Sequence, residues 1–421
     1  MNTLTHIARE AGRTAPDFFV YQPECSGDIR HSRASNEHFL VSRLSGQTYL
    51  AVWTQSSFEG NPDQHIVISK SVDGGVVWSE PRTLAGPDLP EGSGMASWAF
   101  PLISRTGRIY IIYSRHTGVN DVFTHTTGLM AGIFSDDEGK TWSQESIIPM
   151  PRSIWDNPDP DVPANWIVWQ KPIRLADGRY FSGFTRWVSP SVRPPKPIDE
   201  WWAEASVVQF IRFENVDEGP DIDGLKISWL ARDKDALQTP LVGHPSVPCI
   251  QEPSIVVLPD QRLFCVMRTT LGSPYYSVGS PDGSEWTRPE ILRQYDDGPA
   301  LPHPLSPCPI YETGLGDYVL LYHNHDGYFL DKTPSDTSEH RRPVCLARGE
   351  FRAQAHQPVW FSSPWFFMDN GGVSILRGDL ALYASLTTGE EGPVLWYPDR
   401  KFFLLGKKID PALFGALEVI S

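Results

Sequence analysis

Apolar residues along this chain are grouped in pairs of short runs, and each pair is divided by a turn-forming residue. Two clear examples are FPLISRTGRIYIIYSRH, which begins at Phe100, and EPSIVVLPDQRLFCVMRT, which begins at Glu252. An apolar run, a turn and a second apolar run predict an antiparallel β-hairpin. Six such segments begin at His38, Phe100, Lys171, Glu252, Cys308 and Gly372. No stretch has helical apolar periodicity over three turns, so the pattern predicts an all-β protein.

A shorter motif recurs between the hairpins. It reads SVDGGVVW at residues 71–78, SDDEGKTW at residues 135–142 and, one residue shorter, SPDGSEW at residues 280–286. Its Asp is suited to cap backbone amides of a turn, its Gly to adopt a positive φ, and its Trp to pack beneath. This Asp-box motif, S-x-D-x-G-x-x-W, is typical of turns between strands. Mutation of Trp78 or Trp142 is therefore expected to reduce stability.

Repeated hairpins of this kind predict a six-bladed β-propeller of four-stranded antiparallel blades. We expect one domain over residues 1–421, because the segments rich in Pro and Asp read as loops between strands. The segments DFFVYQ and VLWYPDRKFFLLG, near the two ends, are expected to share one blade and close the ring. A pair of β-sandwiches is the alternative, but sandwiches do not repeat one hairpin six times.

The charge and composition of the chain argue against several classes of binding partner. The net charge is −15, from 36 basic and 51 acidic residues, which argues against nucleic acid or an anionic membrane as a partner. No apolar run reaches the ~18 residues of a membrane span. The first residues lack a signal-like apolar core, so we expect a cytoplasmic protein, or a secreted or periplasmic one if a signal was removed. The five scattered cysteines are expected to be free thiols.

The hairpin repeat also locates a candidate site. In a propeller, the first strand of each blade starts, and the second strand ends, on the same face. Ionisable and aromatic residues gather at these positions. The arginines on this face are suited to bind a carboxylate. The candidate catalytic residues are His38, Glu59, Glu252 and Arg268. The candidate substrate-binding residues are Trp98, Arg115, His116, Lys171, Arg186, Gln251, His323, Asn324 and Arg342.

The chain resembles the sialidase (neuraminidase-like) superfamily, in its bacterial BNR-repeat branch. The resemblance is carried by the Asp-boxes and by the segments FEGNPDQHIVISKSVDGG, KPI, QEPSIVVL and MRT. The resemblance implies a propeller with an axial site. It also implies a Tyr nucleophile with a Glu partner, an Asp acid/base and three arginines. Glu252 and Arg268 match that Glu and one arginine. The family's Arg-Ile-Pro start is absent, because blade one opens with Asn36, Glu37, His38 and Phe39.

These features predict a glycoside hydrolase of sialidase type that acts exo-wise on a terminal sialic or uronic acid of a glycan. The alternatives are a lyase that performs β-elimination at a uronate with His38 as base, and a non-catalytic glycan-binding propeller. No cofactor is predicted. His323 and His325 alternate as metal ligands would, but no third ligand is evident. The expected partner is an oligosaccharide or glycoconjugate, and the sequence does not indicate the oligomeric state.

Overall fold

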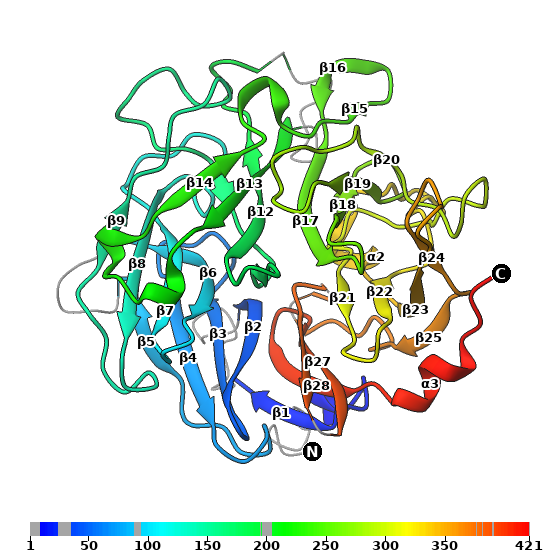
Figure 1. Cartoon of the computed structure of the whole chain (residues 1–421), viewed down its shortest axis with the longest axis horizontal. Coiled ribbons are helices and arrows are strands. Elements are labelled where there is room, and N and C mark those ends of the chain that lie inside the picture. Colours follow the sequence, from blue (N-terminus) through cyan, green and yellow to red (C-terminus); the bar gives the residue numbers. More distant parts are fainter. Residues whose placement is uncertain are drawn as a thin grey trace.

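The computed structural model describes residues 9–23, 35–87, 94–193, 195, 204–375, 377–380, 382–389 and 391–420. Within these ranges, six antiparallel sheets are arranged in a ring (Figure 1), which confirms the predicted six-bladed β-propeller. Four sheets have four strands, and the third and fifth each have one additional short strand. In the same ranges, no helix has the length and apolar character that a membrane-spanning segment requires.

The blades follow the chain in order. Blade one contains β2 (Ser35–Ser45), β3 (Thr48–Ser56), β4 (His65–Ser71) and β5 (Arg82–Ala85). Blade two contains β6 (Ala96–Ile103), β7 (Ile109–Arg115), β8 (Leu129–Ser135) and β9 (Ser146–Ile148). Blade three contains β10 (Trp166–Ile167), β11 (Ile173–Arg174), β12 (Tyr180–Trp187), β13 (Ser206–Phe213) and β14 (Ile227–Leu230).

The second half of the ring is built in the same way. Blade four contains β17 (Ile250–Val257), β18 (Leu263–Thr269), β19 (Tyr275–Gly279) and β20 (Glu290–Ile291). Blade five contains β21 (Ile310–Glu312), β22 (Tyr318–Tyr322), β23 (Val344–Phe351), β24 (Val359–Phe361) and β25 (Trp365–Met368). Outside the blades lie a small hairpin, β15 (Pro240–Leu241) and β16 (His244–Pro248), and the short α-helices α2 (Thr337–His340) and α3 (Pro411–Ala416). The described residues also form the 3-10 helices η3 (Val216–Glu218), η4 (Ile222–Gly224) and η5 (Asp233–Asp235).

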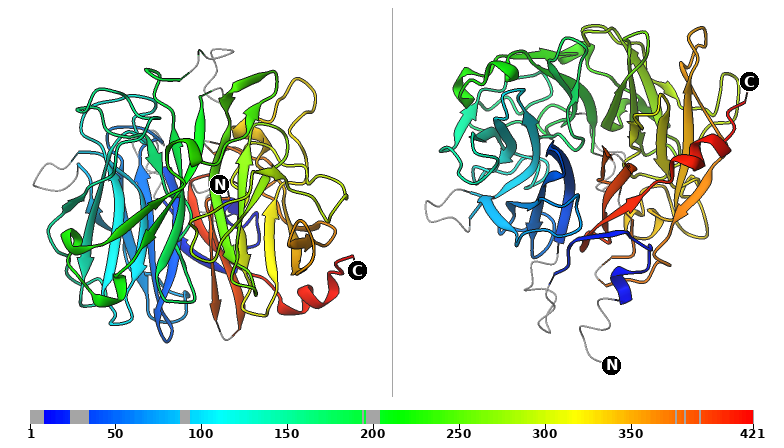
Figure 2. Two further views of the ribbon diagram at one scale, coloured as in Figure 1. Left: turned by 45° about the horizontal axis from the view of Figure 1, so that its top comes forward. Right: turned by 60° about the horizontal axis from the view of Figure 1, so that its bottom comes forward.

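Blade six joins distant parts of the chain. It contains β26 (Ser385–Gly389), β27 (Gly392–Asp399), β28 (Phe403–Lys408) and β1 (Phe18–Tyr21). Strand β1 pairs antiparallel with β28, and Phe18 faces Gly406 in the register. Figure 2 shows this blue strand beside the red ones. The outer edge of β28 is therefore covered by a strand from the other end of the described chain.

The core lies between the blades. Strands β12 and β18 are buried along their whole length, because each blade packs between two neighbours. One apolar cluster joins Phe181 and Phe210 of blade three to Ile255 and Met267 of blade four. This sandwiching explains why strands such as β7 and β18 begin with unbroken apolar runs and do not alternate with polar residues.

The three Asp-box sequences form turns between the third and fourth strands of blades one, two and four. In the first turn, Ser71 Oγ donates to Asp73 (2.8 Å), whose carboxylate accepts from the Val77 amide (2.9 Å). The Trp78 indole donates to the Gly75 carbonyl (2.8 Å). The turns at residues 135–142 and 280–286 repeat these Ser–Asp and Trp–Gly bonds.

Mutation of an Asp-box tryptophan is expected to affect stability and not chemistry. Trp286 stacks on Phe210 with ring centroids 4.0 Å apart and an interplanar angle of 8°. Trp286→Ala should lower the free energy of unfolding by about 3 kcal/mol, as for other packed aromatics. Denaturant unfolding measures this change, and Trp286→Phe should retain most of the stability. A loss of activity per folded molecule at unchanged stability would contradict this assignment.

One predicted hairpin is wrong. The segment that begins at Gly372 was expected to form the first hairpin of blade six, with its turn near Asp379. The observed hairpin is β26–β27, which turns at Gly389–Gly392. No described residue between 372 and 384 is in a strand, and only the end of the predicted segment, residues 385–387, falls within β26. The segment's apolar side chains Leu380 and Leu382 pack in the core between blades five and six and leave the backbone irregular.

The four described cysteines agree with the expectation of free thiols. Cys249, Cys265, Cys308 and Cys345 are free and buried. Cys25 lies outside the described residues.

Candidate active site

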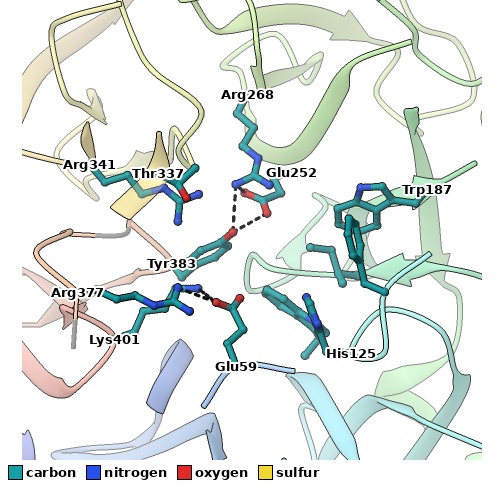
Figure 3. Close-up of a pocket in the computed structure, with 13 residues that line it drawn as sticks. Glu59, His125, Trp187, Glu252, Arg268, Thr337, Arg341, Arg377, Tyr383 and Lys401 are labelled. Atoms are coloured by element: carbon teal, nitrogen blue, oxygen red, sulfur yellow. Dashed lines mark hydrogen bonds and ion pairs between the residues drawn. The ribbon is translucent and has the colours of Figure 1, made fainter. Parts of the chain in front are cut away.

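A pocket of about 280 Å³ opens on the face where first strands start and second strands end. Glu252 comes from the start of β17, Arg268 from the end of β18 and Trp187 from the end of β12. Figure 3 shows the pocket, which is lined by Glu59, Trp98, Phe123, His125, Ile167, Trp187, Glu252, Arg268, Thr337, Arg341, Arg377, Tyr383 and Lys401.

Backbone bulges position two of the lining side chains. The register of β6 against β7 shifts between Ser97 and Phe100, and Trp98 has φ 57°. In β17 the register shifts after Gln251, and Glu252 has φ 50°. The backbone amides of Trp98 and Glu252 donate to threonines of neighbouring blades, over 3.1 and 2.7 Å. A positive φ is costly for these residues, and such strain is characteristic of functional sites.

A triangle of polar contacts lies at the centre of the pocket. The Tyr383 hydroxyl donates to Glu252 Oε1 over 2.7 Å and accepts from Arg268 Nη1 over 3.1 Å. Arg268 Nη1 is also 2.8 Å from Glu252 Oε2. Behind it, Gln251 Oε1 accepts two bonds from the same guanidinium, at 2.8 and 3.1 Å. Arg268 is therefore fixed in orientation by three neighbours.

Burial sets the protonation of this triangle. It raises the pKa of Glu252, although Arg268 and the Tyr383 hydroxyl oppose the shift. It also raises the pKa of Tyr383, so the phenol keeps its proton at neutral pH. A phenol that donates to a carboxylate of increased basicity has the arrangement needed to activate an oxygen nucleophile.

Further cations surround Tyr383. The Arg341 guanidinium lies 5.9 Å from the Tyr383 ring, and its Nε donates to the Leu305 carbonyl (3.1 Å). Its Nη1 is 3.9 Å from Asp379, a long contact. Figure 3 shows Arg341 on the same side of Tyr383 as Arg268. Two guanidinium groups on one side of the tyrosine are suited to bind an anionic substrate group.

Glu59 is the second carboxylate of the pocket. Its Oε2 accepts from Arg377 at 2.8 Å and from Lys401 at 2.6 Å. These two cations hold the pKa of Glu59 well below its usual range, against the effect of burial. Figure 3 draws Glu59 and Glu252 on opposite sides of Tyr383.

The remaining wall is aromatic. Trp98 lies 5.7 Å from Tyr383 and 6.1 Å from His125, measured between ring centroids. Phe123 stacks on His125 at 5.9 Å and meets Trp187 edge to face. Flat apolar faces beside a charged floor suit a sugar ring, which has apolar C–H faces and polar edges.

The structure brings Glu59, Trp98, Glu252 and Arg268 together, as the sequence predicted, with Gln251 behind Arg268. His38 does not line this pocket. Its imidazole is fully buried and packs on Trp98, with centroids 5.1 Å apart. Burial lowers the pKa of His38 to about 3, so it is neutral and shielded from a substrate.

Several predicted arginines bind carboxylates elsewhere. Arg186 is buried and paired with Asp156 at 3.0 Å. Arg115 pairs with Glu145. Arg342 forms two bonds to Asp369, at 2.9 and 2.6 Å. Each pair neutralises the charge of its arginine outside the pocket.

The other predicted binding residues also lie outside the pocket. His116 is part-exposed and bonds Asn120 (2.8 Å). Lys171 extends to the carbonyls of Val41 (3.1 Å) and Leu386 (3.2 Å), which ties blade three to blades one and six. The buried ring of His323 lies against His303 and bonds Ser306. Asn324 is exposed, with φ 55°.

Sequence reasoning missed five ionisable residues that line the pocket: His125, Arg341, Arg377, Tyr383 and Lys401. Arg341 directly precedes the predicted Arg342, and only the fold decides which of the two side chains enters the pocket. Tyr383 lies in the segment that was predicted as a strand. Among the described residues, no group of three or more His, Cys, Asp or Glu side chains is arranged to hold a metal ion.

Comparison with known proteins agrees with this architecture. Residues 47–394 match the family described as BNR repeat-like domain, so the chain belongs to that family. No curated protein matches the sequence.

The solved structures that resemble this chain share its fold at low identity. The Hadza microbial sialidase Hz136 has a TM-score of 0.59 and 15% identity, and the match covers 91% of this chain and 66% of that one. Trypanosoma rangeli sialidase in complex with sialic acid has a TM-score of 0.55 and 13% identity, and the match covers 93% of this chain and 56% of that one. A Dyadobacter fermentans protein of unknown function has a TM-score of 0.60 and 12% identity, and the match covers 94% of this chain and 97% of that one. The propeller is therefore sialidase-like, and this chain spans about two thirds or less of the two sialidases.

Proposed function

We propose that this protein is an exo-acting glycoside hydrolase of sialidase type, which removes a terminal acidic sugar from a glycan. The observation that carries the proposal is the 2.7 Å hydrogen bond from Tyr383 to Glu252, with Arg268 beside both in the axial pocket. A pocket of about 280 Å³ at the end of the ring suits one terminal sugar. The similarity to a sialidase that was solved with sialic acid supports this substrate class.

In the proposed reaction, the Tyr383 oxygen attacks the anomeric carbon while its proton passes to Glu252. Glu59 donates a proton to the departing glycosidic oxygen and later accepts one from water. Arg268 and Arg341 bind the substrate carboxylate. Water then cleaves the tyrosyl–sugar bond, and Glu252 returns the proton to the Tyr383 oxygen.

The position of His38 favours hydrolysis over elimination. A lyase needs a base at the proton next to the uronate carboxylate, and the sequence placed His38 in that role. The His38 ring has no exposed surface and does not line the pocket. By contrast, Tyr383, Glu252 and Glu59 all line it, which supports a nucleophile, its base and an acid.

A substrate panel tests the proposal. The protein should release the terminal sugar from sialosides or from glycans with a terminal uronic acid, with no rise in absorbance near 235 nm. Released sugar is measured by chromatography and the unsaturated uronate by absorbance. A rise at 235 nm would identify a lyase instead. Binding without turnover of any acidic glycan would indicate a glycan-binding propeller.

A further inference from the structure

The carboxyl group of Glu37 lies close to that of Glu59 but does not line the pocket. Glu37, on the first strand of blade one, is 1% exposed. Its Oε2 accepts from Lys401 Nζ over 3.0 Å, and the same ammonium donates to Glu59 over 2.6 Å. Among the described residues, no N–H or hydroxyl group donates a hydrogen bond to Glu37 Oε1. Two buried carboxyl groups therefore share one lysine.

Such a pair binds a proton, because two adjacent buried carboxylates do not both ionise readily. Burial and the neighbouring Glu59 raise the pKa of Glu37 to about 8. A hydrogen bond between the two carboxyl groups raises the pKa of Glu37 and lowers that of Glu59. At neutral pH the shared proton therefore resides on Glu37, and Glu59 is ionised between Lys401 and Arg377.

This distribution creates a difficulty for the proposed reaction. A glycosidic oxygen needs a proton as it leaves, but Glu59 in the empty pocket has none to give. Two neighbouring carboxyl groups whose pKa values are shifted in opposite directions are the usual basis for acid and base roles in one site. Here the protonated partner is buried, and the ionised partner faces the pocket.

We propose that Glu37 is the proton store of the site, which protonates Glu59 when the substrate binds so that Glu59 can act as general acid. This inference rests on the proposed hydrolase function. Glu37 transfers its proton to Glu59, and Glu59 passes it to the leaving oxygen as the bond to the sugar breaks. When Glu59 later removes a proton from the attacking water, it returns that proton to Glu37. Glu37 is thus a positioning residue that acts through Glu59.

Substrate charge supplies the driving force for the transfer. The charged or titratable groups that face the carboxyl pair are Lys401, Arg377, His125 and Tyr383. A substrate carboxylate that enters the pocket adds a negative charge near these cations and weakens their hold on Glu59. The proton affinity of Glu59 then rises, and the proton moves toward the reacting oxygen.

The test compares two substrates that differ in their need for an acid. Glu37→Gln keeps a neutral group beside Lys401 but cannot release a proton. For an alkyl glycoside of the acidic sugar, kcat should fall by about 10²-fold, the lower end for general acid catalysis. For a nitrophenyl glycoside, whose leaving group needs no proton, kcat should change less than about threefold. Asp156→Asn, a buried carboxyl partner of Arg186 outside the pocket, should leave the ratio of the two rates unchanged.

Equal loss on both substrates, or no loss on either, would overturn the role of Glu37. Infrared difference spectroscopy gives a second readout that needs no turnover. The wild-type protein should show a protonated carboxyl band at pH 7 that disappears as pH rises through about 8, and Glu37→Gln should lack this band. Absence of that band would refute the proton store. A band without hydrolysis of any acidic glycoside would refute the proposed function instead.

Discussion

Tyr383→Phe is expected to lower kcat on an acidic aryl glycoside by at least about 10³-fold, because the proposed nucleophilic oxygen is removed. The ring stays between Trp98 and the cations, and the change deletes only the hydroxyl that bonds Glu252 and Arg268. Initial rates at saturating substrate measure the effect. Melting temperature should remain close to that of the wild type.

A trapping experiment accompanies this variant. With a fluorinated analogue of the acidic sugar, the wild-type protein should accumulate a covalent adduct on Tyr383, seen by peptide mass spectrometry, and Tyr383→Phe should not. Turnover by Tyr383→Phe at the wild-type rate would remove Tyr383 from the role of nucleophile. An adduct on another residue would move that role elsewhere.

Arg268→Lys is expected to raise KM for an acidic glycoside by about 10- to 100-fold, as for the loss of a charge-assisted hydrogen bond. Lysine keeps the positive charge but loses the planar fork that reaches Gln251, Glu252 and Tyr383. The fall in kcat should be smaller than that in Tyr383→Phe. Steady-state kinetics on the acidic sugar separates the two constants.

Arg186→Lys is the matched control for this variant. Arg186 is also a buried arginine at the end of a second strand, but it pairs with Asp156 away from the pocket. Its replacement should reduce stability and leave the KM of the folded protein unchanged. Identical kinetics for Arg268→Lys and the wild type would exclude Arg268 from carboxylate binding.

The sequence was sufficient for the blades because hairpin periodicity is a local property. Turn residues and apolar runs located the β6–β7 and β17–β18 hairpins, and strand ends located Glu252 and Arg268 on one face. The sixth hairpin was misplaced because Leu380 and Leu382 are apolar for core packing and not for strand pairing. Local pattern does not distinguish these two causes of burial.

The site was only partly predictable for a different reason. A strand end fixes the face of the ring but not the partner of each side chain. Arg186 and Arg115 lie at such ends, and acidic residues in loops nearby, Asp156 and Glu145, bind them. Tyr383 comes from an irregular segment, whose path depends on the whole ring, and Lys401 comes from the turn between β27 and β28.

The pairing of β1 with β28 has a consequence for how the protein matures during synthesis. Residues 18–21 leave the ribosome early, but their partner strand, around Gly406, is made near the end of the described chain. Tyr383 and Lys401 also belong to this late portion. A nascent chain with five sheets therefore has an unpaired strand and an open ring, and it lacks Tyr383, the proposed nucleophile. Closure depends on contacts of very long sequence separation, which form slowly. Ring closure and completion of the candidate active site should thus occur together, late in the folding of the propeller.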